Sequence, residues 1–239
     1  MLRTVKSVIG RVLGEKAKGF FDYYRFPELR KAWGGPFNGQ KHRQNIFAAL
    51  KAFDFSAIME TGSFRGTTTE LFARTGLPVF SCEGHPRIYG FARARLLGFR
   101  NVSLGFGDSR LQLRKILAEL GPAGCGKPIF FYLDAHWQMD LPLAEELEIV
   151  LEACAQPVIM IDDFEVPDDR GYRFDRYGEG KSLIRSYIEP FISRDNLSLF
   201  YPAAPSADES GAKRGCAILV RADKREKMMA IAQLRLASP

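Results

Sequence analysis

Apolar residues change their spacing along the chain in a regular way. Short apolar runs alternate with longer stretches in which apolar residues recur every three or four positions. The first pattern is typical of buried strands and the second of helices that pack on a sheet. Because the two patterns alternate, the sequence predicts βαβ units and a parallel sheet covered by helices on both faces. The expected strands are 56–60, 78–83, 102–108, 128–136 and 157–164, and the expected helices are 41–53, 66–76, 86–99, 110–120, 143–154 and 181–192.

Both ends of the chain depart from this rhythm. Residues 197–203 and 215–222 are two further apolar runs, which we predict to form a terminal hairpin. In residues 2–13, apolar residues at helical spacing alternate with basic residues, a pattern that predicts an amphipathic basic helix. The glycine-rich stretch 34–40 separates this start from the rest. The domains we expect are an N-terminal helical extension over 1–35 and one α/β domain over 36–239.

Charge is concentrated at the start of the chain. Residues 1–50 hold ten Lys and Arg against three Asp and Glu, whereas the whole 239-residue chain holds 34 against 28, so the remainder is about neutral. A basic helix of this kind is usually solvated and packed on its own domain or on a second subunit of a homodimer. Attachment to a membrane surface is the less favoured alternative. The neutral remainder and the lack of a continuous basic stripe argue against nucleic acid as a partner.

Cysteine usage and hydropathy indicate a cytoplasmic protein. Cys82, Cys125, Cys154 and Cys216 are far apart and form no CxxC pair, so we interpret them as thiols in a reducing compartment. No apolar run reaches the ~18 residues of a membrane span. The basic start also lacks the continuous apolar core and the cleavage site of a signal peptide.

Acidic residues follow all five predicted parallel strands. In open α/β sheets, ligands bind beyond the carboxyl ends of the strands, so these residues are expected to line one site. Carboxylates there suit ribose hydroxyls, an amino group, a sulfonium charge or a metal ion better than a phosphate. The strand ends carry Glu60-Thr61-Gly62, Glu83, Gly107-Asp108-Ser109, Asp134-Ala135-His136-Trp137 and Asp162-Asp163.

The stretch 60-ETGSFRGTTT-69 resembles the first motif of class I S-adenosylmethionine-dependent methyltransferases, an acid followed by GxxxG. Gly62 and Gly66 are four apart, so the GxGxxG dinucleotide fingerprint fails. The resemblance implies a Rossmann-like, doubly wound sheet of about seven strands whose last strand is antiparallel. It also implies that Glu83 holds the ribose and that Asp108 and Ser109 contact the adenine. The cofactor-binding residues it implies are Glu60, Thr61, Gly62, Ser63, Gly66, Thr67, Glu83, Gly84, His85, Asp108, Ser109 and Asp134.

The motifs FFYLDAHW and VIMIDDF resemble those of the cation-dependent O-methyltransferases of the catechol and macrolide-sugar types. That resemblance implies methyl transfer to a hydroxyl oxygen of a small molecule or sugar, with Mg²⁺ bound by Asp134, Asp162 and Asp163. Carboxylate oxygens are the ligands that a hard divalent ion prefers. With Asp134, His136 is the expected catalytic residue, acting as a base or as a partner of a neighbouring carboxylate. The additional Ala135 departs from the catechol pattern and leaves the position of His136 open.

Two polar loops are expected to border the acceptor. Residues 165–182 interleave tyrosine and phenylalanine with arginine and are typical of a lid, and Asn38 and Gln40 would lie on the opposite wall. Three alternatives remain open for the chain as a whole. They are a metal-independent methyltransferase, an NAD- or nucleotide-binding oxidoreductase, and a non-enzymatic module that binds through its basic N-terminal helix.

Overall fold

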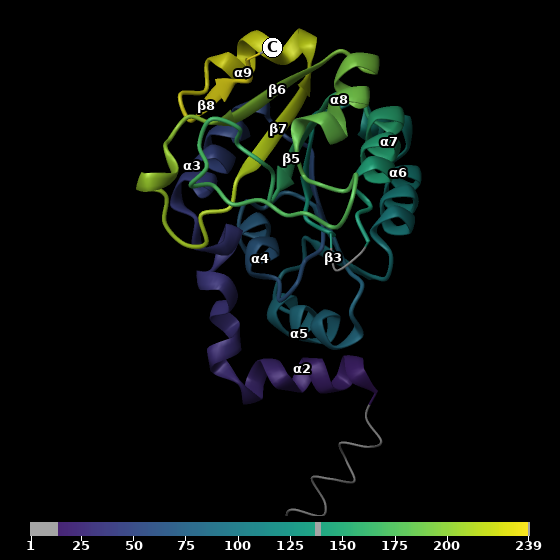
Figure 1. Ribbon diagram of the computed structural model, residues 1–239. Helices are drawn as coiled ribbons and strands as arrows, with labels where there is room; N and C mark the ends of the chain where they lie inside the picture. The colour runs from purple at the N-terminus through teal and green to yellow at the C-terminus, as the bar shows by residue number, and fades with distance from the viewer. Residues whose placement is uncertain (1–13, 137–139, 239) are drawn as a thin grey trace, which may run out of the picture.

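A single sheet of eight strands forms the centre of the described part of the chain (Figure 1). The computed structural model describes residues 14–136 and 140–238. The strand order is β3-β2-β1-β4-β5-β7-β6-β8. The first five of these strands in space are mutually parallel, and β7 runs antiparallel to both β5 and β6. The bounds are β1 Ala57–Thr61, β2 Val79–Glu83, β3 Val102–Phe106, β4 Ile129–Leu133, β5 Pro157–Asp162, β6 Leu197–Pro202, β7 Cys216–Arg221 and β8 Leu234–Leu236.

Helices cover both faces of this sheet, and the two faces have separate apolar cores. Along each strand, successive side chains enter opposite cores: Ile58 and Phe130 lie in one, and Met59 and Phe131 lie in the other. Residues of α3, α4 and α9 complete the first core, whereas residues of α6, α7 and α8 complete the second. The α-helices are α2 Glu15–Arg25, α3 Lys41–Leu50, α4 Thr67–Ala73, α5 Pro86–Leu96, α6 Ser109–Cys125, α7 Leu143–Ala153, α8 Arg185–Arg194 and α9 Arg225–Met229, and the 3₁₀ helices are η1 Pro27–Gly34, η2 Pro36–Gly39, η3 Lys51–Phe53, η4 Ser206–Asp208 and η5 Ala222–Lys224.

The predicted fold class is confirmed, with one correction to the strand count. All five predicted parallel strands and the terminal hairpin of β6 and β7 are present. The described residues form eight strands rather than seven, because β8 adds to the outer edge of β6. This strand has only three residues, which is too short for an alternating pattern to be recognised in the sequence.

The helix α2 lies across α5 at the end of the molecule (Figure 1). Two glycines allow the backbones to touch: a Cβ at Gly19 would lie 1.7 Å from the carbonyl oxygen of Arg87, and one at Gly90 would lie 1.9 Å from that of Lys16. The guanidinium of Arg87 also forms an ion pair with Asp22 at 2.6 Å. The helix predicted over 2–13 lies outside the described residues, and the division into 1–35 and 36–239 stays a prediction. Among the helices of the described residues, none is long and apolar enough to cross a membrane.

Candidate active site

The carboxyl ends of β1 and β4 are adjacent at the point where the strand order reverses. From β1 the chain proceeds to β2 and β3 on one side, while β4 and β5 lie on the other. This is the topological switch point, where open α/β sheets bind their ligands. The predicted cofactor and metal residues follow these strands, so the fold brings them to one edge of the sheet.

Gly62 occupies the tightest position at this edge. Its φ of 77° is one that side-chain-bearing residues rarely adopt, and a Cβ there would lie only 2.3 Å from the backbone oxygen of Asp134. The amide of Asp134 in turn donates to the carbonyl of Thr61 at 3.1 Å. The glycine is therefore required by the close approach of the end of β4, whether or not a ligand is bound.

The loop after Gly62 is held by the neighbouring strand. The amides of Gly62 and Ser63 donate to the carbonyl of Cys82 at 3.1 and 2.9 Å, and the amide of Phe64 donates to the carboxylate of Glu83 at 2.9 Å. Gly66, whose φ is also positive, ends the loop and precedes α4, in which Thr67 is the first residue.

Glu60 lies behind this edge and not at its surface. Its carboxyl group is buried and accepts hydrogen bonds from the hydroxyls of Thr69 and Ser81, which ties β1 to α4 and β2. Burial raises the pKa of Glu60 to about 7, although the two hydroxyls act in the opposite direction. The structure thus places Glu60 beneath the site as a support for the loop.

The acids that follow β2 and β3 differ in exposure, since Glu83 is half-buried and Asp108 is exposed. The half-buried carboxylate of Glu83 also accepts the amide of His85 at 2.7 Å, and His85 itself caps the start of α5. Gly84 between them is exposed. Asp108 caps α6 and forms an ion pair with Arg110 at 2.5 Å, a contact that lowers the pKa of its carboxyl group.

Glu146 is a buried acid at this edge that sequence reasoning missed. It lies on α7, beside the hydroxyls of Ser109 and Thr61, which act to lower the pKa of its carboxyl group. Burial raises the pKa of Glu146 to about 7. Because Thr61 Oγ1 also accepts the amide of Asp134 at 3.3 Å, Glu146 connects α6, α7 and the ends of β1 and β4.

Asp134, His136 and Asp163 form the acidic cluster that the strand ends predicted, with His136 in the place of Asp162. One ligand atom from each lies within 4.8 Å of the others. Nε2 of His136 is 3.5 Å from Oδ1 of Asp134 and 3.6 Å from Oδ2 of Asp163, both longer than a normal hydrogen bond. Three donor atoms of this chemistry around a small space are suited to hold a divalent cation.

Asp162 is directed to the other face of the sheet. Its carboxylate forms a buried ion pair with Arg43 of α3 and accepts the hydroxyl of Tyr132 at 2.5 Å. It also accepts the amide of Asp163 at 2.7 Å, which fixes the backbone of that residue at a φ of 52°. The side chain that we predicted to bind Mg²⁺ is thus paired within the protein and lies outside the cluster.

The two aspartates of the cluster have opposite protonation tendencies. Burial raises the pKa of Asp134 to about 8, and the nearby charge of Asp163 adds to this effect. Burial also acts to raise the pKa of Asp163, but His136 and Arg214 outweigh it and hold that pKa well below its usual range. For His136, burial would lower the pKa, but the carboxylates of Asp163 and Asp134 raise it overall.

Arg214 binds only one of the two carboxylate oxygens of Asp163. Its Nε donates to Oδ1 of Asp163 at 2.7 Å, and its terminal nitrogen pairs with Asp175. The backbone of Arg214 is fixed by Gln40, whose side chain donates to its carbonyl at 2.8 Å and accepts from its amide at 2.9 Å. Oδ2 of Asp163 therefore remains directed toward His136.

Buried polar atoms without a partner gather at this edge. Seven such side-chain atoms occur among the described residues, and four of them belong to residues around the ends of β1 and β4. Buried polar groups in native proteins are nearly always hydrogen-bonded, and each exception requires an explanation, such as a ligand. Three of the four atoms, Oγ of Ser63, Nε2 of His136 and Oε1 of Glu146, belong to the edge itself, whereas Oε1 of Glu60 belongs to the side chain that supports the loop from beneath.

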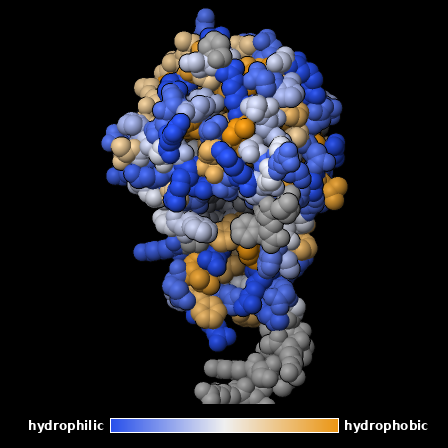
Figure 2. All heavy atoms as spheres, viewed as in Figure 1, coloured by the Kyte–Doolittle hydropathy of each residue, from blue (hydrophilic) through white to orange (hydrophobic). Residues whose placement is uncertain are grey.

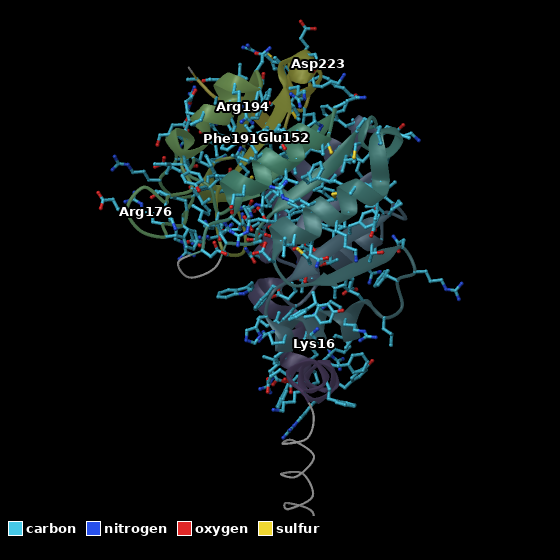
Figure 3. All side chains as sticks on the ribbon, turned by 90° about the vertical axis from the view of Figure 1, so that its right-hand side faces the viewer. Lys16, Glu152, Arg176, Phe191, Arg194 and Asp223 are labelled. Carbon is cyan, nitrogen blue, oxygen red and sulfur yellow. The ribbon has the colours of Figure 1, made fainter. Side chains whose placement is uncertain are left out.

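The two predicted border loops are only partly open to an acceptor. Tyr172 is buried and its hydroxyl donates to the carbonyl of Ala204, while Gln40 is buried against Arg214. Tyr177 does approach the site, since its ring lies 5.6 Å from that of His136, edge to face. Arg176 extends outward from the loop (Figure 3).

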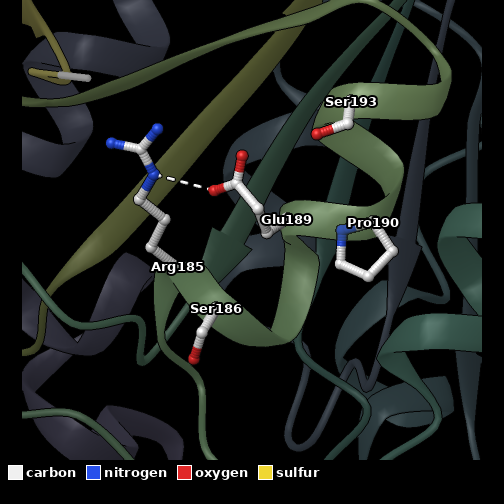
Figure 4. A pocket seen from close by; sticks show the side chains of 5 residues that line it. All are labelled: Arg185, Ser186, Glu189, Pro190 and Ser193. Carbon is white, nitrogen blue, oxygen red and sulfur yellow. Dashed lines mark hydrogen bonds and ion pairs between the residues drawn. The ribbon is translucent and has the colours of Figure 1, made fainter.

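A shallow pocket on α8 involves none of the predicted site residues. It has a volume of about 690 Å³ and contains an ion pair between Arg185 and Glu189 at 2.9 Å (Figure 4). Its other lining residues are Ser186, Pro190 and Ser193. It offers neither the glycine loop nor the acids of the sheet edge.

Solved structures of methyltransferases share this fold. A putative O-methyltransferase from Klebsiella pneumoniae is 18% identical to this chain, with a TM-score of 0.51 over 91% of this chain and 96% of its own. A putative caffeoyl-CoA O-methyltransferase from Staphylococcus aureus is 15% identical, with a TM-score of 0.51 over 75% and 83%. No protein-family model and no curated protein matches the sequence. The chain therefore has the Rossmann-like fold of the class I methyltransferases, and at these identities the likeness establishes the fold alone.

Proposed function

We propose that this protein is an S-adenosylmethionine-dependent O-methyltransferase. The observation that carries the proposal is the set of unpartnered buried polar atoms at the topological switch point, beside a glycine loop. Both structural neighbours described above are putative O-methyltransferases, which agrees with this proposal. The N-terminal extension over 1–35 would lie outside the catalytic domain.

The ribose and methionine parts of the cofactor fit different groups of this edge. The carboxylate of Glu83 accepts two amides and has further lone pairs for ribose hydroxyls. Ser63 Oγ is buried and unpartnered, and it is available to the amino acid part of the cofactor. Because the Asp108 carboxylate is paired with Arg110, Asp108 and Ser109 would receive the adenine through their backbone.

We further propose that Asp134, His136 and Asp163 hold a divalent cation. When bound, such an ion lowers the pKa of a coordinated hydroxyl and fixes its orientation. The unpartnered Nε2 of His136 and the free Oδ2 of Asp163 fit this purpose, and Arg214 keeps Asp163 ionised. An imidazole in the donor set favours Mn²⁺ or another transition ion over the Mg²⁺ expected from the sequence. The acceptor would be a small molecule or sugar with a free hydroxyl, beside Tyr177.

A metal-independent methyltransferase is the second candidate. The raised pKa of His136 favours it, because an imidazolium between Asp134 and Asp163 can balance both charges without an ion. In that case His136 would orient the acceptor hydroxyl and could act as a base only after losing its own proton.

Calorimetric titration with S-adenosylhomocysteine tests the cofactor, with NAD⁺ as the rival ligand. We expect micromolar affinity for S-adenosylhomocysteine and no heat with NAD⁺. Binding of NAD⁺ alone would support the oxidoreductase alternative instead. Absence of binding by either would contradict the assignment of the site.

Mn²⁺ binding followed by electron paramagnetic resonance tests the cation site separately. We expect His136→Ala and Asp163→Asn to lose Mn²⁺ binding, whereas Asp108→Asn, an acid of a neighbouring strand end, retains it. Equal Mn²⁺ binding by all of these variants, or S-adenosylmethionine-dependent turnover that is unchanged by a chelator, would favour the metal-independent candidate.

A further inference from the structure

The outer side of α2 and the adjoining η1 expose three large aromatic side chains. Phe21 is 56% exposed, Tyr24 is 52% exposed and Trp33 is 67% exposed. These are three of the seven large hydrophobic residues that are exposed in the described residues. Exposed apolar residues that occur singly need no explanation, whereas three exposed aromatic residues between positions 21 and 33 raise the question of what covers them.

Phe21 and Tyr24 contact rings of their own helix, Phe20 and Tyr23, yet all three aromatic residues stay more than half exposed. The opposite side of α2 faces α5, where Gly19 meets the backbone of Arg87 and the ring of Tyr23 lies 5.3 Å from that of Phe91. Phe21 and Tyr24 are three positions apart, so they share the side that α5 does not cover. Figure 1 shows α2 at the end of the molecule, beyond α5, where a flat partner could reach it. Hydrophobic residues are also visible in this lower part of the molecule in Figure 2.

Basic residues also outnumber acidic ones on the same segment. Residues 15–34 contain five Lys and Arg against three Asp and Glu. Two of those three acids already have partners, since Asp22 pairs with Arg87 and Glu15 pairs with Lys18, each at 2.6 Å. The exposed Arg25 and Lys31 lie next to the aromatic residues in sequence. The surface thus combines aromatic rings with an uncompensated positive charge.

We propose that this surface, which consists of Phe21, Tyr24 and Trp33 with Arg25 and Lys31, docks on an anionic lipid bilayer. Aromatic rings are favoured at the level of the lipid headgroups, and each nearby Lys or Arg is attracted by anionic lipids. A second copy of the chain fits less well, because a symmetric contact would place the two basic segments against each other. Nucleic acid would satisfy the charge but does not account for the three aromatic rings.

Co-sedimentation of the full chain with lipid vesicles tests this proposal. We expect binding to vesicles of phosphatidylcholine mixed with phosphatidylserine, little binding to phosphatidylcholine alone, and weaker binding at high salt. The chain has only two tryptophans. In a Trp137→Phe variant, Trp33 is the single reporter, and its emission should shift to shorter wavelength when anionic vesicles are added.

Two double variants show whether vesicle binding depends on this surface or on exposed hydrophobic residues anywhere on the protein. Phe21→Ser with Trp33→Ser should lower the partition coefficient by about tenfold or more, since two aromatic side chains no longer leave water. Leu111→Ser with Met229→Ser removes two residues that are 67% and 56% exposed elsewhere, and it should leave binding unchanged. Equal losses in both pairs, or no vesicle binding at all, would overturn the proposal. It would also be overturned if the aromatic pair abolished only a dimer seen by light scattering, or if the chain bound DNA but no vesicles.

Discussion

The carboxyl ends of β1 and β5 lie in one sheet, two strands apart, yet their buried acids have opposite surroundings. At β5, each aspartate has an arginine: Arg43 pairs with Asp162 and Arg214 pairs with Asp163. At β1, Glu60 is bonded by two hydroxyls, the nearby Glu146 lies beside two others, and each glutamate retains an unpartnered oxygen. Burial raises the pKa of these two glutamates to about 7, whereas the pKa of Asp163 is lowered.

This difference indicates that the ends of β1 and β5 have different roles in the site. The β5 end is neutralised by the protein's own arginines and forms a rigid support for one side of the acidic cluster. The β1 end and the adjacent β4 end leave polar groups unpaired, as expected of a surface that a ligand completes. Substitutions at each half of the edge distinguish these two roles.

Removal of the buried arginine should have the largest effect. Arg43→Met leaves the Asp162 carboxylate buried without its cation, and we expect a loss of about 3–5 kcal/mol in the free energy of unfolding, measured by urea denaturation. Adding Asp162→Asn to this variant should restore much of the loss, because the buried charge is then removed as well. A loss below about 1 kcal/mol in Arg43→Met would show that the pair does not support the β5 end.

Substitution of Gly62, the glycine that follows β1, should cause the second-largest loss of stability. Gly62→Ala introduces a Cβ both at a positive φ and 2.3 Å from the Asp134 carbonyl, so we expect a loss of about 2–4 kcal/mol in the free energy of unfolding. Gly76→Ala is the matched control, because Gly76 has a φ of 80° but no neighbouring atom within 4 Å. It should lose only about 1 kcal/mol, the cost of the backbone conformation. Equal losses in the two variants would contradict the close contact between β1 and β4.

Glu146→Gln should stabilise the protein at alkaline pH. Because the folded pKa of Glu146, about 7, lies above its usual value of 4.5, the folded state binds the proton more tightly, and stability falls as the pH rises from about 4.5 through 7. Glutamine keeps the shape without the charge, so the variant should be more stable than the wild type by roughly 1–2 kcal/mol at pH 8 and about equal at pH 5. Thermal unfolding at both pH values measures this. A difference that does not change with pH would show that Glu146 is not buried as a neutral acid.

The surface ion pair on α8 should have the smallest effect. Glu189→Ala removes a partly exposed partner of Arg185, and we expect a change below about 0.5 kcal/mol in the free energy of unfolding. S-adenosylhomocysteine affinity should also be unchanged, since this pair lines a pocket away from the strand ends. A clear loss of affinity would move the ligand site to α8.

The strands could be predicted because buried parallel strands appear in the sequence as nearly continuous apolar runs. The carboxyl ends of such strands share one edge, so it could also be predicted that Asp134 and Asp163 would meet. What was wrong was the number of strands, since the short β8 leaves no pattern to recognise.

The separation of Asp162 from Asp163 depends on which helix covers which face. Val158, Met160 and Asp162 alternate along β5, and the first two point into the core beneath α3. This alternation already places Asp162 on that face, but the sequence does not reveal that α3 supplies Arg43 there. A signal for Arg43 did exist, because it precedes the buried Ile46, Phe47 and Leu50 by three, four and seven positions.

The same signal applies to Glu146. It shares the apolar side of α7 with Leu143, Leu147 and Val150. A charged residue on the buried side of a predicted helix indicates a paired or neutral buried charge, and this rule would have identified both missed residues. Their partners are distant in sequence, so only the fold could identify them.

A crystal structure of the protein with S-adenosylhomocysteine would show whether the cofactor binds at the ends of β1 and β4. We predict that the ligand lies beyond the ends of β1 and β4, with its ribose at Glu83 and its amino acid part at Ser63, close to His136. A hydrogen bond between the ligand and the unpartnered Oγ of Ser63 would complete that part of the edge. A ligand bound at α8, or at any site that leaves Glu83 and Ser63 without contact, would contradict the assignment of the cofactor site to this edge.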